Sequence, residues 1–148
     1  DWQGSMVEAI GQFRSYNRKE DGGSHLELSV SVQGIRFLDG GCQDYEDNNC
    51  IYLKGFLCKP PAYRKTPLGR EICDILLAVN RPYGKSDYIP CIAWGKDAVL
   101  ASRLDVGSAV EVMGRIQSRE YVKSLSETET ETRVAYEVSI YRLETGDV

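Results

Sequence analysis

Long apolar runs are missing from this chain of 148 residues. The longest lies near Ile75–Val79, far short of the roughly 20 residues of a membrane-spanning helix, and no basic and then apolar leader opens the sequence. Hydrophobic residues make up 42% of the chain, which is enough for a globular protein to bury a core. We therefore expect a cytoplasmic protein with no membrane partner.

Residues that carry out catalysis or bind metals are also scarce. His25 is the single histidine and is expected in a polar turn, and the five cysteines form no Cys-x-x-Cys pair. The sequence has no P-loop, no Gly-x-Ser-x-Gly motif and no defined pair of carboxylates. We expect no enzyme, metal site, cofactor or small-molecule substrate, and mostly buried, reduced thiols at Cys42, Cys50, Cys58, Cys73 and Cys91.

Charge is distributed unevenly along the chain, although the net charge is only -4. Residues 1–53 hold 4 basic and 9 acidic side chains, residues 54–123 hold 12 and 7, and residues 124–148 hold 2 and 6. The central segment is therefore basic between two acidic ones. An acidic chain of this kind can still bind a polyanion through its central segment.

An internal repeat suggests how the chain is divided. Residues 4–15 (GSMVEAIGQFRS) match residues 107–118 (GSAVEVMGRIQS) at six of twelve positions, with a constant offset of 103. In both copies a polar loop and an alternating strand pattern follow. We expect residues 1–39 to be the last two strands of a truncated first domain, residues 40–49 an acidic linker, and residues 50–148 a complete domain; a hairpin decorating a single domain is the alternative.

The pattern of the complete domain indicates an all-β fold with one short helix. Period-2 patterns predict five strands, and Lys96–Leu104 predicts a helix between the third and fourth. This order suits a small five-stranded Greek-key barrel. The predicted strands are Ile51–Cys58, Glu71–Arg81, Tyr88–Trp94, Ala109–Val122 and Arg133–Leu143.

Aromatic and basic side chains gather on the third and fourth predicted strands and in the turn before the third. Tyr83, Tyr88 and Trp94 could stack with unpaired bases, and the nearby Arg81, Lys85 and Lys96 could neutralise phosphates. On the fourth strand one face carries Arg115, Arg119 and Tyr121, which a core would not accept without partners. The turn KTPLG is framed by further cations, Arg64, Lys65 and Arg70.

Two interpretations of these side chains remain open on the residues alone. Each residue taken singly is an ordinary rim or solvated residue, and the same exposed aromatics could bury against a partner chain in an interaction or oligomerisation module. Taken together, they favour a surface for single-stranded nucleic acid. An RNA-binding or primosomal protein is a third possibility.

The motifs YRKTPLG, ILLAVNR, YIPCIAWGK and VGSAVEVMGRIQSREY occur in this order between residues 63 and 121. On these motifs, residues 50–144 resemble the bacterial single-stranded DNA-binding protein family. The resemblance implies an OB-fold that binds single-stranded DNA without much sequence preference in replication, recombination and repair, in a nucleoid-associated homo-oligomer. The partial repeat resembles a subfamily with two OB domains in one chain.

The resemblance also assigns roles to particular residues. The family's stacking aromatics would be Tyr83, Tyr88, Trp94 and Tyr121, with tyrosine at three positions where tryptophan is common. The residues implied to contact phosphates are Arg64, Lys65, Arg81, Lys85, Lys96, Arg115 and Arg119. The family's members usually carry a long flexible tail with an acidic, hydrophobic tip, and we expect none here from a sequence that ends in ETGDV.

Overall fold

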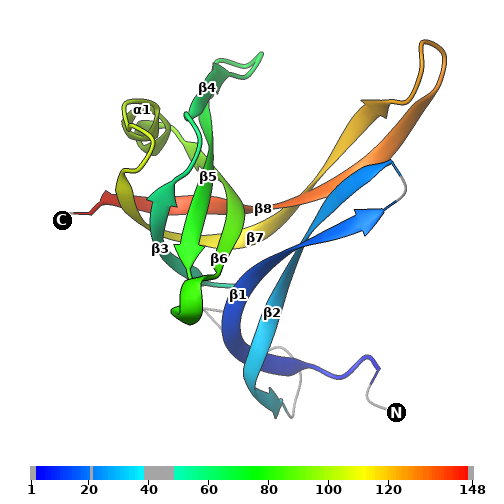
Figure 1. Cartoon of the computed structure of the whole chain (residues 1–148), viewed down its shortest axis with the longest axis vertical. Helices are drawn as coiled ribbons and strands as arrows, with labels where there is room; N and C mark the ends of the chain where they lie inside the picture. The colour runs from blue at the N-terminus through cyan, green and yellow to red at the C-terminus, as the bar shows by residue number, and fades with distance from the viewer. Residues whose placement is uncertain (1–2, 21, 39–48, 147–148) are drawn as a thin grey trace. The chain divides into compact units, whose positions relative to one another are not determined.

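The computed structural model describes residues 3–20, 22–38 and 49–146. These residues form two compact units, Asp1–Cys50 and Ile51–Val148 (Figure 1). Most of the expected linker, residues 40–49, lies outside the described residues. Within the described part, no helix is long and apolar enough to cross a membrane.

The first unit is an antiparallel hairpin of two long strands, β1 (Val7–Glu20) and β2 (Gly23–Phe37). The expectation of two strands here is confirmed, but the prediction that His25 lies in a turn is wrong. β2 begins at Gly23, so His25 is already paired with Arg18 in the ladder. The strand begins earlier than predicted because the connection between the strands is short.

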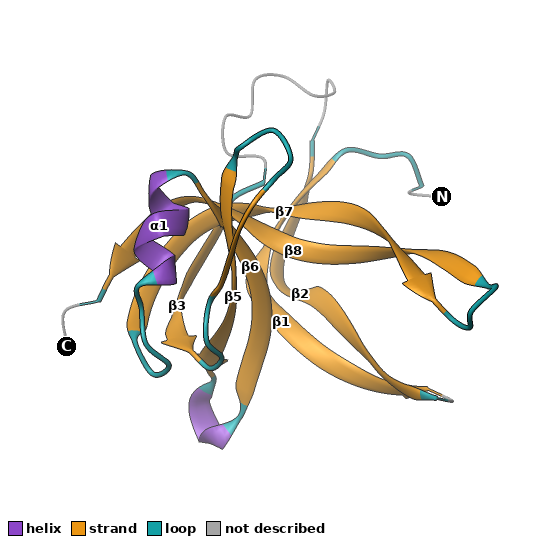
Figure 2. Ribbon diagram, turned by 90° about the horizontal axis from the view of Figure 1, so that it is seen from above, coloured by secondary structure: helices purple, strands orange, loops and turns teal. Residues whose placement is uncertain are grey.

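The second unit is a β-barrel with one helix (Figure 2). Antiparallel pairing joins β3 to β7, β7 to β8 and β5 to β6, and a short parallel pairing joins β6 to β8. A further pairing of β3 with β5 closes the ring. The strands are β3 (Ile51–Leu57), β5 (Glu71–Asn80), β6 (Ser86–Trp94), β7 (Ala109–Ser124) and β8 (Thr130–Thr145), with β4 (Ala62–Lys65) added at the edge of β5.

The predicted strands and helix of this unit are confirmed within a few residues, and β4 is an addition. The close approach that closes the ring depends on Gly55, because a Cβ there would lie 2.6 Å from the backbone oxygen of Ala78. The helix α1 (Lys96–Ser102) buries Ala98 and Ala101. It follows β6 directly and, as Figure 2 shows, lies at one end of the barrel.

Alternation along the strands separates the core from the surface. On β6, Ile89, Cys91 and Ala93 are buried inside the barrel. On β7, Val110 and Val112 point inward and are fully buried, whereas Arg115 is exposed. The inward and outward faces are therefore those that the period-2 pattern predicts.

The prediction of mostly buried thiols is only partly correct. Cys73 and Cys91 are buried, and burial raises the pKa of both thiols. Cys58 is half-buried and Cys50 is exposed, because both lie at the ends of β3 rather than within it. Cys42 lies outside the described residues.

Candidate nucleic-acid interface

The candidate site lies on the outer face of the barrel, which we define as the outward side chains of β4 to β8. The strand register places these side chains in rows across the sheet. Arg64 of β4 is opposite Ile72 of β5, which is opposite Trp94 of β6. One row further along, Ile92 of β6 lies beside Ser139 of β8, which is opposite Arg115 of β7. Side chains from five strands thus share one surface.

Three of the four predicted stacking aromatics lie on strands of this surface. Tyr88 and Trp94 lie on the same face of β6 as Pro90, because each is an even number of residues from it. Tyr88 is 44% exposed and Trp94 is half-buried. Tyr121 is 38% exposed and lies opposite Arg133 on the β7–β8 hairpin. Figure 1 shows that this hairpin extends well beyond the barrel.

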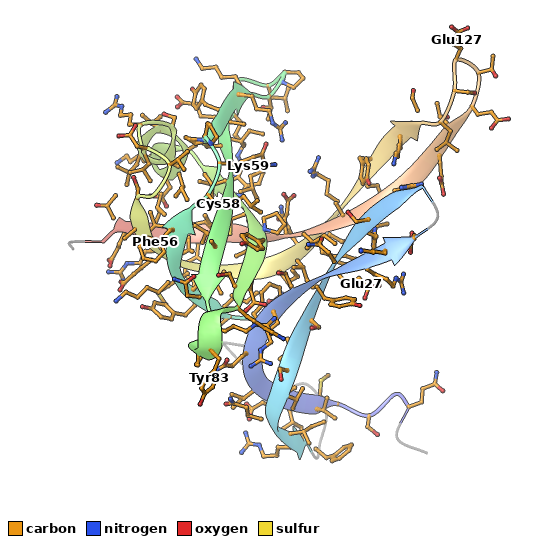
Figure 3. All side chains as sticks on the ribbon, in the orientation of Figure 1. Glu27, Phe56, Cys58, Lys59, Tyr83 and Glu127 are labelled. Carbon is orange, nitrogen blue, oxygen red and sulfur yellow. The ribbon has the colours of Figure 1, made fainter. Side chains whose placement is uncertain are left out.

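The fourth aromatic, Tyr83, lies in the turn between β5 and β6. The turn is a single 3₁₀ segment, Pro82–Gly84, closed by a hydrogen bond of 2.7 Å from the backbone N–H of Arg81 to the carbonyl of Lys85. Tyr83 has φ of 71° and is fully exposed. Figure 3 shows its ring pointing away from the barrel. A bulky residue held in the left-handed region at no benefit to packing is a feature of functional sites.

Carboxylates hold three of the predicted arginines, two on the outer face and one, Arg81, beside the turn between β5 and β6. Arg64 Nε lies 3.2 Å from Asp74, and Arg119 Nε lies 3.1 Å from Glu137. The third, Arg81, binds Asp87 through two nitrogens, with Nε donating at 2.7 Å. These hydrogen bonds raise the pKa of Arg81 further. The positions of the three guanidinium groups are therefore fixed, and their charges are largely balanced.

The other predicted cations are exposed and form no ion pair with any residue that the structure describes. Arg115 lies on β7 opposite Ser139 of β8, Lys65 ends β4, and Lys85 follows the Tyr83 turn. Lys96 is the first residue of α1, beyond the end of β6. Their charges remain available to an anionic ligand.

Several partners of the predicted site residues are not evident from the sequence. Asp87 and Glu137 are 2% and 4% exposed, and Glu137 also accepts a hydrogen bond of 3.3 Å from Gln117 Nε2. The guanidinium carbon of Arg70 lies 4.4 Å from the centre of the Trp94 ring. Only the register between strands could have revealed these partners, because each lies far from its partner in sequence or across a turn.

Taken together, the outer face offers aromatic rings on two strands and a turn, with free and balanced cations between them. Such a surface can stack with unpaired bases and neutralise a phosphate backbone, and neither interaction depends on base identity. Glu137, the buried carboxylate on this face, accepts hydrogen bonds from Arg119 and Gln117, so its charge is balanced.

Comparisons with known proteins agree with this chemistry. Residues 48–143 match the model of the single-strand binding protein family. The chain is 40% identical over 80 residues to the single-stranded DNA-binding protein of Halalkalibacterium halodurans, which covers 49% of this chain and 48% of that protein. It is 38% identical over 80 residues to single-stranded DNA-binding protein A of Bacillus subtilis, with 49% and 46% covered. The matched region spans about half the length of these curated relatives.

The fold is similar to solved structures over nearly the whole chain. A deletion mutant of the single-stranded DNA binding protein from Thermus aquaticus superposes with a TM-score of 0.78 and 26% identity, covering 98% of this chain and 62% of that one. The wild-type protein from the same organism gives a TM-score of 0.65 at 22% identity, covering 97% and 57%. The first match includes the β1–β2 hairpin as well as the barrel.

Proposed function

Because the chain belongs to the single-strand binding protein family, we propose that it binds single-stranded DNA along the outer face of the barrel with little sequence preference. The observation that carries the proposal is the combination of Tyr88, Trp94 and Tyr121 on one face with Arg115, whose charge no described carboxylate balances. Each stacked base would contribute about 1–3 kcal/mol. A surface of this kind binds and protects the strand, and it needs no catalytic group.

In the proposed complex the DNA strand runs across β5, β6 and β8 to β7. Tyr83 reaches from the turn to one end of this path, and Tyr121 extends it along the β7–β8 hairpin. The exposed cations Lys65, Lys85 and Arg115 contact phosphates directly. Arg64, Arg81 and Arg119, whose positions their carboxylates fix, contribute hydrogen-bond donors more than net charge.

The same chemistry suits a role in replication, recombination and repair, where unpaired DNA is exposed. We also propose that the chain works as a homo-oligomer near the nucleoid, since a single outer face covers only a short length of strand. These roles rest on the proposed binding, and the oligomer is testable by sedimentation.

Titration with labelled oligo-dT at two salt concentrations tests the proposal. We expect saturable binding that weakens as salt rises and that is accompanied by quenching of tryptophan fluorescence. Trp94→Ala should weaken binding about 5-fold to 150-fold, which corresponds to the stacking of one base. Arg103→Ala is a matched control, because Arg103 is exposed at the end of α1 and is not among the residues assigned to the outer face.

The rival interaction module makes the opposite prediction for the same variants. If Tyr88→Ala and Trp94→Ala disperse an oligomer and leave DNA binding unchanged, the aromatics serve a protein interface. Duplex DNA of equal length that competes equally well would remove the preference for single strands.

We further propose that residues 1–39 are the C-terminal part of a first OB-like domain, residues 40–49 are a linker, and residues 50–148 are a complete OB-fold with Greek-key connections. The order in which the five barrel strands pair supports the last assignment. For the first, the support is a matched irregularity: the β1–β2 ladder shifts register at Ile10/Gly11 and the β7–β8 ladder at Met113/Gly114, at the offset of the repeat.

A further inference from the structure

Two contacts fix the indole ring of Trp94 at the end of β6. Its Nε1 donates a hydrogen bond of 3.0 Å to Ser139 Oγ on β8. The guanidinium group of Arg70 lies over the ring, with its carbon 4.4 Å from the ring centre. This distance is within the range of a cation–π contact. In the free protein, therefore, part of the Trp94 ring is already occupied.

Arg70 is directed to the ring by the turn that precedes β5. The backbone N–H of Thr66 donates to the carbonyl of Arg70 at 2.8 Å, and the backbone N–H of Arg70 donates to Thr66 Oγ1 at 3.0 Å. Gly69, with φ of 84°, allows the chain to reverse between them. Since residues two apart share a face, Arg70 lies on the same side as Ile72, the cross-strand partner of Trp94.

The side of the ring that Arg70 covers is inferred from the burial of its neighbours. Ile72 and Ile92 share the outward face of the sheet with Trp94, yet each is only 2% exposed. The indole extends from β6 to Ser139, which lies beside Ile92 in the register. A ring that follows this path covers the sheet with one face, and Arg70, which is exposed, then covers the face toward solvent.

The charge of Arg70 is not balanced by a carboxylate. Arg64, Arg81 and Arg119 are all held in ion pairs with carboxylates. Among residues with a described position, Arg70 forms no ion pair, and its side chain contacts the Trp94 ring instead. It is thus a free cation placed directly at a stacking ring.

We propose that Arg70 holds the place of a base on Trp94 in the free protein and moves to a phosphate when single-stranded DNA binds. The inference rests on the proposed function and extends it to a residue and a step that it does not include. Base stacking is stronger than an exposed cation–π contact, so a base can take the ring face. The guanidinium that leaves the ring is then free to pair with the phosphate of the incoming strand.

The experiment uses the full chain with Trp2→Phe, so that Trp94 is the only tryptophan. Arg70→Ala, Arg70→Lys and the control Arg103→Ala are compared with this parent. Acrylamide quenching of fluorescence measures how open the ring is in the free protein, and oligo-dT affinity at several salt concentrations measures how many phosphates the protein neutralises.

We expect Arg70→Ala to increase quenching in the free protein, because the solvent face of the ring is uncovered. The slope of log affinity against log salt, which is negative, should become shallower by about 0.7, the value for one neutralised phosphate of a single strand. Arg70→Lys should keep the slope, since the charge remains, and Arg103→Ala should leave both the quenching and the slope at parental values.

Unchanged quenching and an unchanged salt slope in Arg70→Ala would overturn the inference. The inference would also be overturned if the salt slope of Arg70→Lys became as shallow as that of Arg70→Ala, because the charge of residue 70 would then not be the relevant property. The proposed function fails by a different result, namely Trp94→Ala binding oligo-dT as tightly as the parent. Thermal melting of each variant checks that the barrel is intact.

Discussion

Because of the conformation of Tyr83, one substitution at this residue should change DNA binding and protein stability in opposite directions. A non-glycine residue in the left-handed region costs about 1–2 kcal/mol, and the exposed Tyr83 ring recovers little of this through packing. We expect Tyr83→Gly to raise the free energy of unfolding by up to about 1 kcal/mol. The gain is smaller than the cost of the left-handed conformation, because glycine also increases the conformational entropy of the unfolded chain. Urea unfolding measures this change.

The same substitution should weaken oligo-dT binding, because it removes a ring that can stack. Tyr83→Phe is the matched control: it keeps the ring and the backbone strain, so both stability and binding should remain near parental values. A Tyr83→Gly protein that is no more stable than the parent would show that the left-handed conformation of Tyr83 has no net cost in this turn.

Single residues also show where sequence-based prediction reached its limit. Strand alternation is sufficient to place Tyr88 and Trp94 on one face of β6 and Arg115 on the outward face of β7, because period 2 is a local property. It could not show that Arg119 is held by Glu137, since that pair depends on the register between β7 and β8. Local patterns thus predict which residues face the ligand, and long-range pairing determines which cations keep a free charge.

Among the elements, the β7–β8 hairpin depends on a bulge at Gly114. The register shifts between Met113 and Gly114, and a bulge bends its strand and increases the twist. A Cβ on Gly114 would lie 2.3 Å from the backbone oxygen of Ser139 and 2.9 Å from a methyl group of Val138. The backbone of Ser139 cannot move away from such a Cβ without changing the pairing of β7 with β8.

We therefore expect Gly114→Ala to lower the free energy of unfolding of the barrel by about 1–3 kcal/mol, the usual cost of overpacking. Ser118→Ala, four residues along the same strand at an exposed position, is the control and should change stability by less than about 0.5 kcal/mol. Urea unfolding of both proteins measures the difference. Equal stabilities would mean that the ladder slides to accommodate the methyl group.

The strand β4 shows why one element was not predicted. Its four residues, Ala62–Lys65, are all exposed. The segment therefore has no buried face, and it is a buried face that produces alternation of apolar and polar residues in the sequence. It is a strand only because Ala62 and Lys65 pair with the edge of β5. The five barrel strands, in contrast, each bury one face and therefore carry the pattern in their sequence.

At the scale of the whole molecule, the two units differ in their hydrophobic cores. Every buried hydrophobic residue among those described lies between Leu53 and Leu143, within the second unit. In the first unit, Ile10, Val30 and Ile35 are 63%, 47% and 60% exposed. Only the barrel buries enough apolar surface to offset the conformational entropy lost on folding.

This difference predicts how the chain behaves when it is divided. We expect residues 50–148 alone to unfold cooperatively, with a midpoint close to that of the barrel transition in the full chain. The fragment should also bind a short oligo-dT with unchanged affinity, because every residue assigned to the outer face lies within it. Circular dichroism during heating and fluorescence titration measure the two properties.

Residues 3–38 provide the matched comparison, since an isolated two-stranded hairpin is marginally stable at best in water. We expect this peptide to show no cooperative transition on heating. If instead residues 50–148 melted well below the full chain, the hairpin would contribute to the stability of the barrel, and the division into separately folding units would be wrong. If the fragment kept its stability but bound short oligo-dT more weakly, residues of the first unit would form part of the binding site.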